Sequence, residues 1–299
     1  MDPKLSGTSG NPVVVTGLGY EFPASLRSWF AAGISAELQG TAALSHDADP
    51  VPFLRVKKTA KFMSKQDRLA MSAAARAVSS SGLPADVLET QTLIAMGVGP
   101  IPFQEDEALA VAELSHQDGS FSVECFCRDA YEGVNPMLLF ACLPNMPTYH
   151  ISANLNIRGG YYLTYPSCTE SYQALQNAVV SLTEGRALAV LFGGVADQQN
   201  FLVRNHHHKS RQKLPAPDCS CFLVLETLRH AQARKALVLA RLDTVQSEPD
   251  TAGMSFNRTF CLGPVDLPLE VARFIEGGAG HLRHRLCESG SSFESIWEK

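Results

Sequence analysis

Cys168 is the residue with the clearest chemical potential in this chain, because it stands at the head of a predicted amphipathic helix. Apolar side chains follow it at steps of three or four, and a glycine stands where the C-terminal cap is expected: Tyr172, Leu175, Val179, Leu182 and Gly185. Unpaired amides at a helix N-terminus favour a thiolate. A cysteine in this position can therefore act as a nucleophile.

The segments around this helix predict a βαβ unit. A short apolar and aromatic run precedes Cys168, and a compact apolar run from Ala187 to Phe192 follows the helix and closes at Gly193-Gly194. Two buried strands joined by a helix are typical of a parallel sheet. The sequence therefore predicts an α/β fold with the cysteine at a strand-to-helix turn.

The stretch from Asn145 to Asp197 resembles the β-ketoacyl synthases of the thiolase fold, in which a strand, a cysteine loop, a buried helix and a Gly-Gly strand follow in this order. Further segments resemble the family's first strand, first long helix and a later strand and helix: Val13 to Gly19, Lys61 to Leu83, and Cys221 to Arg234. The resemblance implies a thiolase-like layered αβαβα fold with a complete first half and a truncated second half. It assigns residues 12–242 to the ketosynthase-like part and residues 243–299 to a partly irregular remainder of the same domain.

The chain departs from the family pattern at the catalytic histidines and next to the catalytic cysteine. The resemblance implies two histidines from the second half of the fold, but residues 243–299 contain only His281 and His284, outside the family's glycine and threonine setting. Glu170 stands in the first turn after Cys168, and a like charge disfavours a thiolate. Cys168, the one candidate catalytic residue, is therefore expected to be degenerate.

A ketosynthase-like chain without these histidines resembles a chain-length factor, specifically the shortened forms in type II polyketide synthases of the highly reducing, polyene-forming kind. This implies a heterodimer with a full-length ketosynthase, transient binding of an acyl carrier protein that carries an acyl or malonyl chain, and an acyl tunnel along the interface. Residues 135–158 resemble the interface segment. The candidates for lining the tunnel are Met137, Phe140, Ala141 and Pro144, and ordinary core packing is the alternative for each.

Two other functions stay open. The chain is an active acyltransferase or condensing enzyme if Cys168 works with a base such as His150 or His207. It is a structural or regulatory pseudoenzyme if it forms no tunnel.

Several further clusters have weaker functional interpretations. A basic cluster either docks an acidic carrier protein or is a solvated face: Arg55, Lys57, Lys58, Lys61 and Lys65. The pairs Cys125/Cys127 and Cys219/Cys221 are expected on strands, and His206 to His208 in a polar loop. None of these has the spacing of a common metal site, so no metal and no cofactor is predicted.

Composition narrows the class of protein. A net charge of −5 argues against a nucleic-acid partner, no apolar window is long enough to span a bilayer, and eight cysteines without framework spacing suggest reduced thiols in the cytoplasm. Loops are expected at residues 41–55 and 212–217, an irregular region at 246–267, and a short helix from Leu269 to Glu276. The tail beyond Gly278 is expected to be mobile at its end, although Phe293 and Trp297 are able to dock, and the truncated half is expected to uncover apolar surface.

Overall fold

The computed structural model describes residues 4–6, 11–28, 44–100, 105–134, 143–209, 214–249, 261–278, 280–288 and 291–299. Its main feature is a nine-stranded sheet. The strands are β1 (Lys4–Ser6), β2 (Val13–Glu21), β3 (Thr92–Val98), β6 (Tyr161–Thr164), β7 (Ala189–Ala196), β8 (Cys219–Thr227), β9 (Ala240–Pro249), β10 (His281–Glu288) and β11 (Ser291–Glu298). Their order is β10-β11-β9-β2-β8-β7-β3-β6, and β1 pairs with β9.

The predicted βαβ unit is confirmed, with one strand inserted between its two strands. β6 and β7 are both parallel to β3, which lies between them, and α8 (Glu170–Thr183) connects them. From β7 onwards the sheet is antiparallel through β8, β2, β9, β11 and β10. The parallel part therefore carries the cysteine turn.

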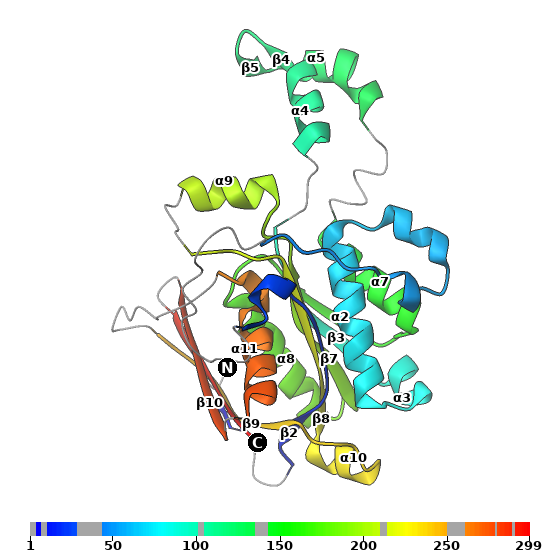
Figure 1. The fold of residues 1–299 in the computed structure, drawn as a ribbon, viewed down its shortest axis with the longest axis vertical. Coiled ribbons are helices and arrows are strands. Elements are labelled where there is room, and N and C mark those ends of the chain that lie inside the picture. Colours follow the sequence, from blue (N-terminus) through cyan, green and yellow to red (C-terminus); the bar gives the residue numbers. More distant parts are fainter. Residues whose placement is uncertain are drawn as a thin grey trace.

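Helices divide the molecule into layers, as the thiolase-like fold requires (Figure 1). α2 (Lys65–Ser81), α3 (Ala85–Thr90) and α7 (Met146–Leu155) lie on the outer face of the strands from β6 to β2. α8 and α11 (Asp266–Gly277) lie between these strands and the strands β9, β11 and β10. In the C-terminal part of the described chain, the elements after α10 are β9, η6 (Gly263–Val265), α11, β10 and β11.

The sequence of α2 explains its sharp start and its close approach to the sheet. Ser64 and Asp67 form a capping box, in which each side chain accepts the other's backbone N–H, and Gly82 ends the helix with a φ of 60°. On the sheet side, a Cβ at Gly17 or Gly19 would lie 2.3 Å from a backbone oxygen of α2. Only glycine allows the helix to pack this closely on β2.

The C-terminal tail is ordered, which corrects the expectation that its end is mobile. β10 and β11 form an antiparallel hairpin, and Trp297 is fully buried against the inner core. The opposite face carries Arg283 and Arg285, which both pair with Glu294. Alternation with a period of two thus turns apolar side chains inwards and charged ones outwards. The outer face of this hairpin is therefore charged at these positions.

Residues 105–134, called the arm below, project from the body of the molecule (Figure 1). The arm contains α4 (Glu105–Leu114), β4 (His116–Gln117), β5 (Ser120–Phe121), α5 (Val123–Cys125), the π-helical turn η4 (Phe126–Ala130) and η5 (Tyr131–Gly133). Cys125 and Cys127 therefore lie in helical turns, and the prediction that they share a strand face is wrong.

The remaining connections are partly as expected. Residues 44–50 are irregular, followed by the 3-10 turns η2 (Val51–Phe53) and η3 (Lys57–Phe62), and an earlier turn is η1 (Ala24–Leu26). α10 (Leu228–Ala233) follows β8, and α11 includes the predicted helix but begins at Asp266. The polar loop predicted around the three histidines is wrong, because they lie in α9 (Phe201–Lys209). Among the described residues, no helix has the length and apolar character needed to cross a membrane.

Candidate functional site

Cys168 lies at the edge of the sheet where the parallel strands β6, β3 and β7 end. Thr164 is the last residue of β6, Thr169 is the N-cap of α8, and the helix begins at Glu170. Loops at the carboxyl ends of parallel strands meet at one edge, which is where α/β proteins place their reactive groups. Cys168 is half-buried there and packs against the inner core.

Hydrogen bonds around the thiol order the turn. The Ser171 hydroxyl donates to the Cys168 carbonyl at 2.8 Å, and the Thr164 hydroxyl donates to the Glu170 carbonyl at 3.2 Å. The Thr169 N–H donates to the Ser167 hydroxyl at 3.2 Å. The end of β6 and the first turn of α8 are therefore held together, with the Glu170 carboxylate in the same turn as the thiol.

His284 is the histidine of the C-terminal part that comes close to the cysteine helix. It is 7% exposed, and its Nδ1 lies 2.8 Å from the hydroxyl of Tyr172, one turn of α8 beyond Cys168. Its Nε2 lies 2.9 Å from a carboxylate oxygen of Asp266 at the start of α11. Both ring nitrogens are thus engaged in joining α8, α11 and β10, whereas His281 is exposed.

The C-terminal part also fills the space in front of the strand ends. Pro264 in η6 lies so close to the sheet that a Cβ at Gly97 would be 2.6 Å from its Cβ. A Cβ at Gly194 would be 2.6 Å from the carbonyl oxygen of Pro264. Two glycines in neighbouring strands therefore admit Pro264 beside Thr164, at the edge where Cys168 lies.

His150 lies on the other face of the sheet from α8. It is 4% exposed in α7, and its Nε2 is 3.9 Å from Oδ2 of Asp67 in α2. Burial lowers the pKa of His150 and raises the pKa of Asp67 to about 6. The other proposed base, His207, is half-buried in α9. The α7 imidazole therefore lies across the sheet from α8 and Cys168.

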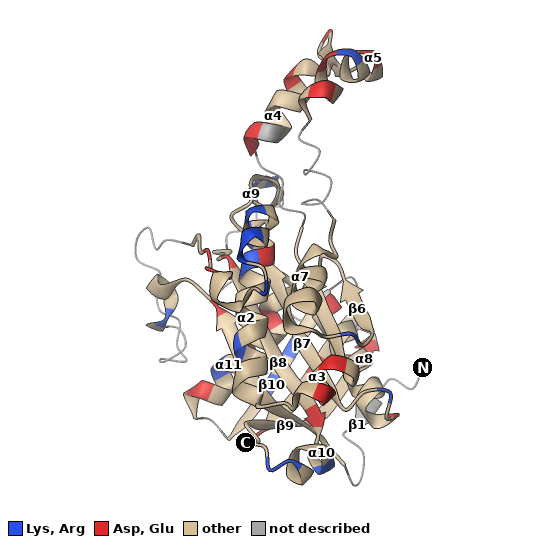
Figure 2. Ribbon diagram, turned by 90° about the vertical axis from the view of Figure 1, so that its right-hand side faces the viewer, with Lys and Arg blue, Asp and Glu red and all other residues tan. Residues whose placement is uncertain are grey.

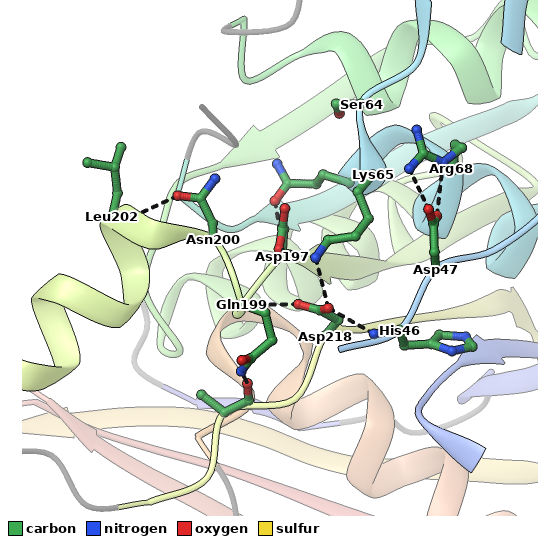
Figure 3. A network of polar contacts seen from close by, with 12 residues as sticks. His46, Asp47, Ser64, Lys65, Arg68, Asp197, Gln199, Asn200, Leu202 and Asp218 are labelled. Atoms are coloured by element: carbon green, nitrogen blue, oxygen red, sulfur yellow. Dashed lines mark hydrogen bonds and ion pairs between the residues drawn. The ribbon is translucent and has the colours of Figure 1, made fainter. Parts of the chain in front are cut away.

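A polar network lies at the carboxyl end of β7 (Figure 3). Lys65 Nζ lies 2.8 Å from Asp197 Oδ1 and 2.9 Å from Asp218 Oδ2. Asp218 is fully buried and also accepts the backbone N–H groups of His46 and Gln199, each at 2.9 Å. The network therefore ties the start of α2 to the end of β7 and the start of β8.

Burial sets the protonation of this network. It raises the pKa of Asp197 to about 6 although Lys65 opposes the shift. Burial alone would lower the pKa of Lys65, but hydrogen bonds and charge from Asp197 and Asp218 raise it overall. The lysine is therefore a cation held between two buried carboxylates.

The basic cluster predicted from the sequence is divided in the structure. Arg55, Lys57, Lys58 and Lys61 are exposed. Lys65 does not belong to this solvated face, because its ammonium group pairs with Asp197. Pro144 is half-buried just before α7. Met137, Phe140 and Ala141 lie outside the described residues.

Cys219 and Cys221 do lie on one strand, β8, and are fully buried. Burial raises the pKa of both thiols well above the usual value. No cluster of three or more potential metal-binding side chains occurs in the part of the chain that the structure describes.

Sequence reasoning missed two clusters, Lys65 with its carboxylates and His284 with Tyr172 and Asp266. Signals for the first were available, because Asp197 follows the Gly-Gly strand and Asp218 directly precedes the next one. The second had no comparable signal, since Tyr172 lies 112 residues before His284 in the sequence, although Asp266 is only 18 residues from that histidine.

The layers and the cysteine turn define a thiolase-like ketosynthase fold. The model of the β-ketoacyl synthase N-terminal domain matches residues 26–221, so the chain belongs to this family. Among curated proteins, no match was found.

Solved structures with the same fold include chains of polyketide synthases. A chain of AntDE:AntF, described as a type II polyketide synthase acyl carrier protein in complex with its ketosynthase bound to the hexaketide, is 18% identical with a TM-score of 0.74, covering 97% of this chain and 99% of that chain. A β-ketoacyl synthase from Burkholderia phymatum STM815 is 14% identical with a TM-score of 0.68, covering 97% and 100%. The ishigamide ketosynthase/chain length factor is 19% identical with a TM-score of 0.60, covering 91% and 71%.

Proposed function

We propose that this chain is a non-catalytic, chain-length-factor-like partner of a full-length ketosynthase in a type II polyketide synthase of the highly reducing, polyene-forming kind. The observation that carries the proposal is the state of His284. In the C-terminal part, this imidazole is the one nearest to the cysteine helix. Its two ring nitrogens contact the Tyr172 hydroxyl and the Asp266 carboxylate. With both nitrogens engaged, the imidazole stabilises α8. We therefore expect that it does not act as a general base for the Cys168 thiol.

The sheet edge supports a heterodimer. Among the strands that the structure describes, β6 lies at the end of the order and pairs with β3 on one side. We expect its other side to present backbone groups to a further strand. Tyr161 on this edge is 60% exposed. A strand of the ketosynthase would pair with β6, with α7 beside it, in the manner of β-augmentation.

In this assembly the ketosynthase does the chemistry and this chain limits the length of the product. The ketosynthase cysteine takes an acyl group from the acyl carrier protein, and condensation with a decarboxylated malonyl group extends it. The growing chain enters a tunnel along the interface, closed by Met137, Phe140, Ala141 and Pro144. The bulk of these side chains then decides when extension stops.

Two surface features fit the same proposal. Arg55, Lys57, Lys58 and Lys61 are exposed and would attract an acidic carrier protein. None of the seven cysteines that the structure describes forms a disulfide, which suits the reducing conditions of the cytoplasm.

The experiment is reconstitution with the ketosynthase and a malonyl carrier protein, followed by mass spectrometry of the products. Phe140→Ala is expected to lengthen the product and Phe140→Trp to shorten it, with total turnover retained. Leu237→Ala, at a position 75% exposed, is the control and leaves length unchanged. The proposal is contradicted if the product length stays the same when each of Met137, Phe140, Ala141 and Pro144 is substituted.

The second candidate is an active acyltransferase or condensing enzyme with Cys168 as nucleophile. Its support is the position of the thiol directly before the N-cap of a 14-residue helix. Intact-mass measurement of the isolated chain with an acyl thioester separates the two functions. A stoichiometric adduct that Cys168→Ala abolishes supports catalysis, and an unmodified chain supports the partner role.

A further inference from the structure

A polar cavity lies beside β2, at the point where this strand separates from β9. Among the described residues, β2 pairs with β9 only at Val14 and Val15. The cavity has a volume of about 770 Å³ and borders the following part of the strand, Leu18 to Phe22, with Arg76 of α2 and Glu276 of α11 as further walls. Three strands separate β2 from β6, the strand that leads to the thiol. The cavity is therefore distinct from the thiol site, and its size suits a small molecule.

One charged group on the cavity wall is compensated within the chain. Glu21 is 7% exposed, with Oε1 2.9 Å from Nη2 of Arg76 and Oε2 2.9 Å from Nε2 of His46. A guanidinium carries five N–H donors, and the Arg76 side chain is 57% exposed, so Arg76 keeps donors for a further anionic group. Glu21 itself needs no cation from outside the chain.

Two further charges on the wall are not compensated. Figure 2 shows basic and acidic residues interspersed over the body of the molecule, where opposite charges can pair. Glu276 is exposed at the end of α11, and its two carboxylate oxygens lie 2.9 and 3.0 Å from the Tyr20 hydroxyl. Arg27 is exposed directly after η1 and also lines the cavity. Within the described chain, neither Glu276 nor Arg27 forms an ion pair.

Both of these charges act on Tyr20. Burial, followed by the hydrogen bond and the charge of Glu276, raises the pKa of Tyr20 to about 12, and the charge of Arg27 opposes this shift. The phenol is therefore neutral at physiological pH and does not cancel the Glu276 charge. The carbonyl groups at the C-terminal end of α11 add partial negative charge beside Glu276, which favours a cation there. The cavity thus offers one acidic and one basic contact to a ligand.

We propose that this cavity binds a small zwitterion, an amino acid with an apolar side chain, with its ammonium group on Glu276 and its carboxylate on Arg27. A ligand with a single charge would leave the other wall charge without a partner, whereas a zwitterion makes charge-assisted hydrogen bonds at both ends. Leu18, Phe22 and Ala24 give the cavity an apolar wall for the side chain. This inference goes beyond the proposed function, because it concerns a second site and holds whether or not the chain pairs with a ketosynthase.

Isothermal titration calorimetry of the full chain tests the ligand class. Leucine or phenylalanine is expected to bind with a dissociation constant below about 1 mM. Two analogues of leucine each lack one charge: 4-methylpentanoate has no ammonium group, and 3-methylbutylamine has no carboxylate. Each analogue is expected to bind at least about tenfold more weakly than leucine, because one charge-assisted contact is lost.

Two variants then identify the two ends of the site. Arg27→Gln is expected to weaken leucine at least about tenfold and to leave 3-methylbutylamine unchanged, since the amine does not use the guanidinium. Glu276→Gln is expected to weaken leucine equally and to leave 4-methylpentanoate unchanged. Arg229→Gln on α10 and Asp86→Asn on α3 are exposed controls that leave leucine binding unchanged. Circular dichroism confirms that each variant is folded.

Three results would each overturn the inference. The first is that neither amino acid binds the wild type at about 10 mM. The second is that a singly charged analogue binds as tightly as leucine, which would show that the cavity does not select a zwitterion. The third is that either variant binds leucine like the wild type. None of these results bears on product length, so the proposed function is tested separately.

Discussion

Replacement of Lys65 by methionine tests whether the polar network at the end of β7 holds the site together. Met removes the cation from Asp197 and the fully buried Asp218 while keeping most of the side-chain volume. Removing one partner of a buried ion pair costs about 3–5 kcal/mol of unfolding free energy. With an unfolding entropy of about 2.1 cal/mol/K per residue, this corresponds to a melting temperature lowered by roughly 5–8 °C.

The pH dependence of this loss identifies its cause. Burial raises the pKa of Asp197 to about 6, so this carboxyl is mostly protonated at pH 5. At that pH the Lys65→Met variant therefore does not bury an unpaired Asp197 carboxylate. Thermal and urea unfolding at pH 5 and pH 7 should show that Lys65→Met loses more unfolding free energy, relative to wild type, at pH 7 than at pH 5. Lys58→Met, at an exposed position on η3, serves as the control and is expected to change stability by less than about 0.5 kcal/mol. A Lys65→Met loss below about 1 kcal/mol at pH 7, or one equal at both pH values, would refute the reasoning.

Two further predictions concern the buried groups on either face of the sheet. The folded pKa of Asp67 is raised from 3.8 to about 6, so its contribution to stability is complete below pH 3.8 and is lost as the pH rises through 6. Urea unfolding should therefore show wild type losing up to about 3 kcal/mol relative to Asp67→Asn between pH 4 and pH 7, and a difference independent of pH would contradict this. Tyr172→Phe removes the hydroxyl bonded to His284 and should lower the unfolding free energy by about 1–3 kcal/mol, measured in urea at pH 7. An unchanged urea midpoint would show that this network does not stabilise α8.

The elements around Cys168 were predictable because their signals are local. The 3.6-residue spacing after Cys168 predicts α8 within two residues, and the compact apolar run predicts the start of β7 within two residues. The turn expected at Gly193-Gly194 is wrong, because β7 continues through both glycines to Ala196. The order of these elements was enough for the thiolase-like fold. β3 could not be placed between β6 and β7 from local pattern, since strand order depends on contacts far apart in the sequence.

The C-terminal part was less predictable because its strands are stabilised by distant partners. β11 pairs with β9 and β10, and Trp297 is buried against helices that precede it by tens of residues or more. Its polar residues alternate with apolar ones, so composition alone indicated a mobile tail. The three histidines of α9 stand in a polar run, and polarity alone does not distinguish a loop from a surface helix.

The candidate site was predictable at the thiol and not at the groups around it. Cys168 does stand directly before the N-cap of α8. The sequence does not indicate the role of Lys65, because a lysine in a basic run gives no sign that it will pair with two distant carboxylates. The engagement of His284 likewise follows from the position of the C-terminal hairpin, which only the tertiary structure supplies.

The most direct test of the proposed partner role is the rate of polyketide formation by the ketosynthase reconstituted with Cys168→Ala. The account predicts a rate within about twofold of wild type, since the sulfur of this chain takes part in no bond-making step and the alanine leaves α8 in place. Loss of product by a hundredfold or more, with the heterodimer intact by light scattering, would show that this thiol carries the acyl group and would contradict the account.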